Sequence, residues 1–464
     1  MEKTHHATSL VVVANRLPVR FISGRGGNQL ISSPGGLVAA LGPALQMGNG
    51  GSWVGWSGTA GLEVQPFEHE GMRLFPITLS RQEVEGFYEG FSNGTLWPLY
   101  HDAIVGPEFH RSWWDTYVAV NRRFAEQAAS VASEGATVWV HDYQFQLVPA
   151  MLREMRPDLR IGFFLHIPFP ARELFLRLPW RRQIADGLLG ADLIGFQTTV
   201  TAHNFRYVVP RVTDATVSGR SIFHRGRTIQ VGTFPIGIDA QRYAQEAQSE
   251  ATTQRVEELR ELFGYPETVL LGIDRLDYTK GIEVRLRAFR ELLDDGRIDG
   301  SRTVLVQIAE PSRSKVQGYA EIRDEVERLV GDINGSFSPL GRHIVHYLHK
   351  AAPFEEVLAL YRLADVMLVT PLRDGMNLVA KEYVASRVDD TGVLVLSEFA
   401  GASHELKKAI LVNPYDIDGL KDSIDDAIHL PVEEQTRRMR SMKRVVHRNT
   451  ASHWADDFLS ALHS

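Results

Sequence analysis

Residues 369–382 combine apolar residues, a glycine-containing turn and polar side chains in an order suited to binding a phosphorylated sugar. The apolar run 364–369 has the length and β-branched content of a buried parallel strand. Apolar residues at helical spacing follow Asn377, a favourable N-cap, and predict a helix. Its first amides would point at an anion at the carboxyl edge of the sheet. Asp374 can accept hydrogen bonds from sugar hydroxyls, and Glu382 can accept them from the two hydroxyls of a ribose. The alternative is an ordinary strand–turn–helix crossover without a ligand.

Fixed cations recur at the ends of other predicted strands. Arg275 and Lys280 follow the apolar run 269–273 and would face the crevice next to the turn at 374–377. Cations and helix amides are the means by which a metal-free site stabilises a departing diphosphate. Arg313 also follows a predicted strand, where it either holds a second phosphate or is an ordinary surface arginine.

Two further segments have a functional and a structural interpretation. Gly35 and Gly36 precede a predicted helix, so they either let a diphosphate approach the backbone or form a plain turn. Residues 86–98 are rich in aromatics but contain glycine, asparagine and proline, which predicts neither a strand nor a long helix. Their aromatics either stack on a sugar or cover a core. The pair Asp416 and Asp418 precedes a helical stretch and favours an N-cap over a metal site.

Strands and helices alternate along most of the chain, which predicts doubly wound α/β units. The predicted strands are 10–14, 138–140, 161–165, 193–196, 269–273, 304–308, 344–348, 366–370 and 393–396. His141 and His166 each follow a strand directly, and this position at the ligand-binding edge of the sheet favours a functional role for both. A length of 464 residues favours two domains, with a hinge expected at 233–239.

Composition excludes several classes of function. With 44% apolar and 23% charged residues, the chain is typical of a globular protein, and its net charge of −7 argues against nucleic-acid binding. The absence of cysteine excludes disulfides, thiolate metal sites and a cysteine nucleophile. Because no apolar run approaches ~20 residues and no signal peptide pattern is present, we expect a cytoplasmic protein without a membrane partner.

Several motifs, taken in their order and spacing from residue 10 to 413, resemble the trehalose-6-phosphate synthase family, glycosyltransferase family 20. These motifs are Asn15-Arg16, Gly35-Gly36-Leu37, Gly55-Trp56-Ser57-Gly58, Tyr88 with Trp97, His141-Asp142-Tyr143, His166-Ile167-Pro168-Phe169-Pro170, 275–281 and 370–382. The resemblance implies an α/β GT-B fold, in which two Rossmann-like doubly wound domains face each other across a cleft. It places an acceptor-binding domain at 1–237, a nucleotide-sugar domain at 238–447, and a C-terminal helix at 448–464 that packs back on the first domain.

The resemblance also implies the residues of both sites. The acceptor site would comprise Arg16, Tyr88, Trp97, Asp142, Tyr143 and Arg313. The donor site would comprise Gly35, Gly36, Arg275, Lys280, Asp374, Met376, Asn377, Leu378, Val379, Ala380, Lys381 and Glu382. The catalytic group would be His166, Arg275, Lys280 and Asp374, of which His166 and Asp374 hold the transferred glucose.

The implied reaction is metal-free and cofactor-free transfer of glucose to glucose 6-phosphate, giving α,α-trehalose 6-phosphate with retention. Retention without an evident carboxylate nucleophile fits same-face substitution, in which the departing phosphate oxygen takes the acceptor's proton. The donor is UDP-glucose or GDP-glucose, because the small Ala351 and Ala352 leave room for a purine. The alternatives are a non-catalytic regulatory paralogue, a pseudo-glycosyltransferase, and an epimerase or phosphorylase on the same fold. The sequence does not determine the oligomeric state, and a homo-oligomer is one of the alternatives.

Overall fold

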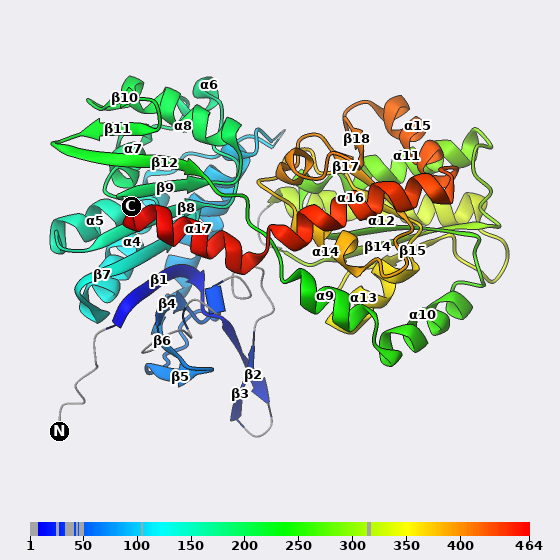
Figure 1. The fold of residues 1–464 in the computed structure, drawn as a ribbon, viewed down its shortest axis with the longest axis horizontal. Helices are drawn as coiled ribbons and strands as arrows, with labels where there is room; N and C mark the ends of the chain where they lie inside the picture. The colour runs from blue at the N-terminus through cyan, green and yellow to red at the C-terminus, as the bar shows by residue number, and fades with distance from the viewer. Residues whose placement is uncertain are drawn as a thin grey trace. The chain divides into compact units, whose positions relative to one another are not determined.

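The computed structural model describes residues 8–24, 27–32, 41–42, 45, 51–103, 105–312 and 317–464. The chain divides into two compact units (Figure 1). Unit 1 comprises Met1–Ile236 and Ala451–Ser464, and unit 2 comprises Gly237–Thr450. Both are α/β units built around a mainly parallel sheet.

The sheet of unit 1 has a parallel centre and antiparallel edges. Neighbours from β12 to β6 pair in parallel, whereas β10, β11 and β5 pair antiparallel. In their order across the sheet, the strands are β10 (Thr216–Ser218), β11 (Ser221–His224), β12 (Arg227–Thr233), β9 (Leu193–Phe196), β8 (Arg160–Leu165), β7 (Ala132–His141), β1 (Thr8–Arg16), β4 (Ser52–Trp56), β6 (Met72–Ile77) and β5 (Phe67–His69). A separate antiparallel hairpin joins β2 (Val19–Gly24) and β3 (Gly27–Ser32).

Helices cover this sheet, among them the last helix of the chain. In the part of the chain that the structure describes, unit 1 includes the helices α2 (Arg81–Glu83), η1 (Val84–Leu96), α3 (Trp97–Tyr100), α4 (Arg111–Val131), η2 (Tyr143–Phe145), α5 (Val148–Met155), α6 (Arg172–Phe175), α7 (Arg181–Leu188), α8 (Thr199–Val212) and α17 (Ala451–His463). Helix α17, red in Figure 1, lies against β8 and β9. Its Phe458 ring stacks on Trp139 of β7, with centroids 4.4 Å apart. Residues distant in sequence therefore complete the core of unit 1.

The aromatic segment 86–98 is helical, so the prediction of a segment that is neither strand nor long helix was wrong. Residues Val84–Leu96 form the π-helix η1, which continues directly into α3. Gly90 permits this arrangement, because a Cβ there would lie 2.5 Å from the Trp113 ring of α4. Its glycine is needed for close helix packing rather than for a turn. A glycine lowers the helix propensity of a segment whether it serves a turn or the close packing of two helices. The sequence alone therefore could not distinguish the two roles of Gly90.

Unit 2 contains a six-stranded sheet in which every pair is parallel. In sheet order its strands are β15 (Val345–Leu348), β14 (Thr303–Glu310), β13 (Thr268–Arg275), β16 (Val366–Val369), β17 (Val393–Ser397) and β18 (Ile410–Val412). Its helices are α9 (Ala240–Ala247), α10 (Glu250–Leu262), η3 (Tyr278–Lys280), α11 (Ile282–Asp294), α12 (Gln317–Phe337), α13 (Phe354–Leu363), α14 (Leu378–Ser386), η4 (Gly401–His404), α15 (Ile417–Ile428) and α16 (Val432–Arg448). All nine predicted strands of the two sheets are confirmed, with shifts of a few residues at their ends.

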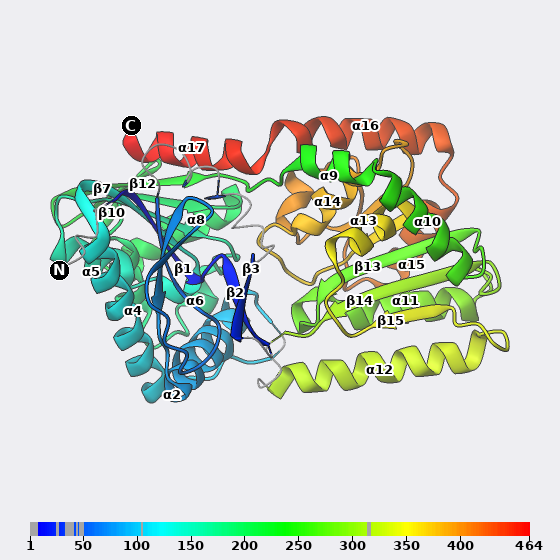
Figure 2. The same cartoon turned by 90° about the horizontal axis from the view of Figure 1, so that it is seen from below.

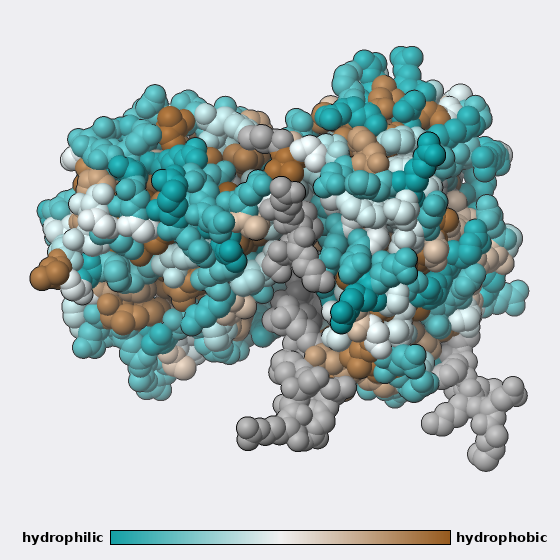
Figure 3. Space-filling model, turned by 180° about the vertical axis from the view of Figure 1, so that it is seen from behind, coloured by the Kyte–Doolittle hydropathy of each residue, from teal (hydrophilic) through white to brown (hydrophobic). Residues whose placement is uncertain are grey.

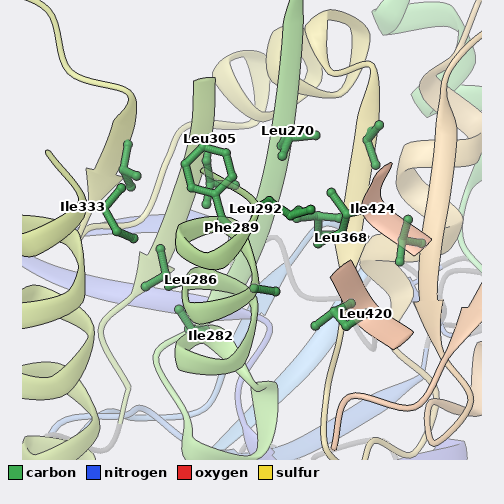
Figure 4. Close-up of a cluster of buried hydrophobic side chains, with 14 of the residues drawn as sticks. Leu270, Ile282, Leu286, Phe289, Leu292, Leu305, Ile333, Leu368, Leu420 and Ile424 are labelled. Carbon is green, nitrogen blue, oxygen red and sulfur yellow. The ribbon is translucent and has the colours of Figure 1, made fainter. Parts of the chain in front are cut away.

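The core of unit 2 lies between its sheet and α11, α12 and α15. Figure 2 shows α11 and α12 on one face of this sheet and α10 and α13 on the other. Leu286, Phe289 and Leu292 of α11 belong to one buried cluster with Leu270 and Leu305 of the sheet (Figure 4). Their spacing of three residues places them on one helix face, so α11 is fixed in orientation.

The surface shown in Figure 3 is mostly hydrophilic, with hydrophobic residues in small separate areas. Among the described residues, no helix is both long enough and apolar enough to cross a membrane. Asp416 caps α15 by accepting a hydrogen bond from the Gly419 amide at 3.0 Å, which confirms the N-cap prediction for the Asp416–Asp418 pair.

Candidate active site

Lys280, Asp374 and Asn377 lie together in unit 2. Lys280 ends η3, just beyond β13, and its Nζ lies 2.6 Å from Asp374 Oδ2. The Asn377 side-chain amide donates to the same carboxylate oxygen at 3.1 Å. The side chains of Lys280 and Asp374 are only 10% and 15% exposed, so their attraction is weakly screened by water. Two donors therefore stabilise Asp374 as a carboxylate and fix its orientation.

A buried arginine supports this group from behind. Arg285 of α11 is completely buried, and its guanidinium donates to Asp274 Oδ2 at 2.7 Å, Thr370 Oγ1 at 3.0 Å and the Lys280 carbonyl at 3.2 Å. Burial raises the pKa of Asp274, and the Arg285 charge opposes that shift. Arg285 thus joins β13, the residue that follows β16, and η3, so that the backbone of Lys280 is held in place.

Helix α14 begins without a side-chain cap. Asn377 occupies the N-cap position with φ of 72°, but its side chain donates to Asp374 and makes no capping hydrogen bond. The prediction of Asn377 as a capping residue was therefore right in position and wrong in function. An uncapped helix start leaves its amides and dipole available to an anion.

The other predicted donor residues differ in where their side chains point. Lys381 is 1% exposed and pairs with Glu405 at 2.6 Å, inside the unit. Glu382 accepts from the Tyr361 hydroxyl at 2.8 Å, and burial raises its pKa. Arg275 is exposed at the end of β13. The remaining donor residues are the buried Met376 and Ala380 and the partly buried Leu378 and Val379.

Arg16 is the exposed cation at the end of β1 in unit 1. Its guanidinium carbon lies 4.1 Å from the centroid of the Trp56 ring and 5.4 Å from that of Tyr88. The two rings meet edge to face at 5.8 Å. Among the described residues no carboxylate pairs with Arg16. A cation that is oriented by aromatic faces and keeps its charge available is suited to binding a phosphate.

Replacing Gly58 with alanine should disturb Arg16 specifically. A Cβ at Gly58 would lie 2.1 Å from an Arg16 terminal nitrogen, and Gly58 has φ of +92°. We expect Gly58→Ala to raise the KM for a phosphorylated substrate held by Arg16 about tenfold, as the loss of one charged hydrogen bond would. Gly61→Ala is the matched control, because Gly61 has φ of +72° with nothing within 4 Å of its Cβ position. Equal KM values in the two variants would contradict this role of Gly58.

Asp142 and His166 lie at the ends of neighbouring strands β7 and β8. Asp142 has φ of +73°, an uncommon conformation for a residue other than glycine, and its Oδ1 accepts from the His166 amide at 3.1 Å. The strained backbone and this bond together fix the carboxylate. Burial lowers the pKa of the His166 imidazole to about 3, so the ring is neutral near pH 7.

Trp97 and Tyr143 pack against each other inside unit 1. Trp97 is 4% exposed, and its ring lies 5.7 Å from that of Tyr143. The Tyr143 hydroxyl donates to Asn93 Oδ1 at 2.8 Å, so this hydroxyl is already engaged inside the unit. The predicted site residues Gly35, Gly36 and Arg313 lie outside the described residues.

The comparisons with known proteins agree on one family. Residues 8–464 match the profile of glycosyltransferase family 20. A curated trehalose-6-phosphate synthase from Mycobacterium sp. (strain KMS) is 54% identical over 465 residues, which span 98% of this chain and 95% of the relative. The chain belongs to glycosyltransferase family 20.

Solved structures support the same assignment for this family 20 chain. The α,α-trehalose-phosphate synthase (UDP-forming) from Burkholderia xenovorans, in complex with glucose-6-phosphate, is 35% identical, with a TM-score of 0.90 and coverage of 98% of this chain and 100% of that one. A trehalose-6-phosphate synthase studied with bisubstrate glycomimetics for glycosyl transfer with retention is also 35% identical, with a TM-score of 0.89 and coverage of 98% and 99%. These matches confirm the predicted GT-B fold and the prediction of a glycosyltransferase.

Sequence reasoning missed the residues that support the family 20 site from inside. Arg285 is the main example in unit 2, and Gln197, which contacts His166 in unit 1, is another. The sequence did contain a signal for Arg285, which lies at a helical spacing shared with the apolar residues Ile282, Leu286 and Phe289. All four are buried on one face of α11. A buried arginine is expected only where it is paired and hydrogen-bonded, which marks such a position as one that holds a site together.

Proposed function

We propose that this family 20 chain transfers glucose from UDP-glucose to glucose 6-phosphate and forms α,α-trehalose 6-phosphate. The observation that carries the proposal is Arg16, an exposed cation held on the faces of Trp56 and Tyr88 without a carboxylate partner among the described residues. Such a group is suited to a sugar phosphate, and the Burkholderia xenovorans relative was solved with glucose-6-phosphate. In this proposal unit 1 binds the acceptor sugar, and the Asp142 carboxylate accepts hydrogen bonds from its hydroxyl groups.

Unit 2 would bind the nucleotide sugar. Its uncapped α14 terminus can take a phosphate, and Lys280 lies beside it on Asp374. In the proposed complex Lys280 and Arg275 neutralise charge on the departing diphosphate, while Asp374 and Asn377 hold hydroxyls of the transferred glucose. Glu382 keeps its proposed role at the ribose, although its bond to Tyr361 must then be shared.

We also propose that the reaction proceeds with retention by same-face substitution. Asp374 is oriented by Lys280 and Asn377, which both donate to the same carboxylate oxygen, and this arrangement suits a group that holds a sugar hydroxyl. The related enzyme studied with bisubstrate glycomimetics carries out glycosyl transfer with retention. In this mechanism the diphosphate oxygen takes the acceptor proton, and the protein contributes positioning and electrostatic stabilisation.

An assay with UDP-glucose, GDP-glucose and glucose 6-phosphate tests the activity and its donor. Ala351 and Ala352 follow β15 in a loop, and their small side chains keep GDP-glucose as the second candidate donor. We expect the product to be trehalose 6-phosphate with an α,α linkage. We expect it to form at a higher rate with UDP-glucose than with GDP-glucose, because the Burkholderia xenovorans relative is UDP-forming. A higher kcat/KM with GDP-glucose would reverse the donor assignment. Lack of a phosphorylated disaccharide with either donor would favour a regulatory paralogue or a pseudo-glycosyltransferase.

A further inference from the structure

Gln197 connects the predicted sugar-binding His166 to Ile236, the last residue of the first segment of unit 1. It directly follows β9 and is only 3% exposed. Its Oε1 accepts from the Ile236 amide at 2.9 Å. Because an N–H group requires an acceptor, this bond determines which end of the side-chain amide faces Ile236. The Gln197 Nε2 group therefore faces His166, where it lies 3.4 Å from Nδ1.

This orientation determines where His166 carries its proton. An amide nitrogen can only donate, so His166 Nδ1 must be the acceptor. In a neutral imidazole the hydrogen then resides on Nε2, which lies 3.2 Å from Nδ1 of His141. The three side chains thus form one directed chain of hydrogen bonds, in which Gln197 donates to His166 and His166 donates to His141.

We propose that Gln197 is a positioning residue that holds His166 as the neutral Nε2–H tautomer, so that His166 does not act as an acid or a base during sugar transfer. The assignment of the tautomer stands on geometry alone, and only the link to sugar transfer rests on the proposed function. Both ring nitrogens of His166 are occupied by protein groups. The ring therefore has no free position for proton exchange with a substrate.

The surroundings of His166 favour the neutral ring. Phe164 of β8 and Trp454 of α17 pack on it, with centroids 4.7 and 5.9 Å away. Among the described residues, the titratable side chains bonded to His166 are those of His141, at the ring, and Asp142, at the backbone amide. Burial lowers the pKa of His141 as well, and the two rings oppose each other's protonation. A single neutral tautomer is the consequence.

Nitrogen-15 NMR of the full chain, with labelled histidine, tests the tautomer directly. In the wild type we expect His166 to show a protonated Nε2 and an unprotonated Nδ1, without titration between pH 5 and 8. A protonated Nδ1, or titration in this range, would overturn the proposal even if no variant could be purified. Because NMR does not depend on turnover, an inactive wild type with the Nε2–H tautomer would contradict the proposed function and support the positioning role.

Gln197→Glu is the sharpest variant, because a carboxylate can accept from both Ile236 and a hydrogen on His166 Nδ1. We expect it to raise the pKa of His166 by about 2, as an adjacent opposite charge does, and to add an ionisation to the pH profile of kcat. Gln146→Glu is the matched control, since Gln146 is fully buried in the same unit but bonds to Tyr100. An unchanged His166 titration in Gln197→Glu would overturn the proposal, as would the same new ionisation in Gln146→Glu.

Discussion

Lys280→Ala should lower kcat by roughly 100- to 1,000-fold, the effect of removing one preorganised donor from a transition state. The Lys280 ammonium lies 2.6 Å from Asp374 and beside the uncapped start of α14. It is therefore placed to oppose the negative charge that develops on a departing diphosphate. The measurement is kcat for trehalose 6-phosphate formation at saturating donor and acceptor.

Loss of stability alone would not explain this result, and two comparisons separate the effects. Removing Lys280 takes away the ammonium that pairs with the poorly exposed Asp374 carboxylate, so the single variant should also be less stable, whereas removing both charges costs less. We expect Lys280→Ala combined with Asp374→Asn to recover thermal stability but not kcat. Lys421→Ala is the matched control, because Lys421 of α15 pairs with Glu291 of α11 and with Asp295, the residue after α11, rather than with Asp374. A near-normal kcat in Lys280→Ala would exclude the proposed role.

Arg16→Ala should raise the KM for glucose 6-phosphate by about 10- to 100-fold, which corresponds to one or two charge-assisted hydrogen bonds. Arg16 has an exposed guanidinium, oriented by Trp56 and Tyr88, that no described carboxylate neutralises. Arg16→Lys keeps the charge but loses the planar stack and the two-pronged contact, so we expect only partial recovery. The KM for the nucleotide sugar should change little, because most of the proposed donor residues, among them Lys280 and Asp374, lie in unit 2.

The control for Arg16 is an arginine in a similar aromatic contact elsewhere in unit 1. The Arg172 guanidinium lies 5.2 Å from the Tyr207 ring centroid, and Arg172 also pairs with Glu173. Arg172→Ala should leave both KM values unchanged. If Arg16→Ala binds glucose 6-phosphate as tightly as the wild type, the acceptor phosphate is held by other groups and our assignment of unit 1 fails.

Local patterns were sufficient wherever one segment decides its own structure. Buried parallel strands are short apolar runs, so composition could predict where nine of them lie, with the limits exact for β9 at Leu193–Phe196 and shifted for others such as β7. Because parallel strands end at a common edge, the same patterns placed Lys280 and Asp374 at one edge, where the structure brings them to 2.6 Å. The motifs at these edges were specific enough to identify the family.

Contacts between distant segments decided the rest. The fold of 86–98 depended on the Trp113 ring beside Gly90, which no local propensity contains. The Asp374 carboxylate oxygen that accepts from Asn377 is also held by Lys280, which lies 94 positions away in the chain. Arg285 and Gln197 act on residues 85 and 31 positions away in the chain. The sequence by itself determined the elements, their edges and the chemical groups present there. Only the tertiary structure decided which groups face one another, because hydrogen bonds and ion pairs depend on separations in space that the spacing along the chain does not specify.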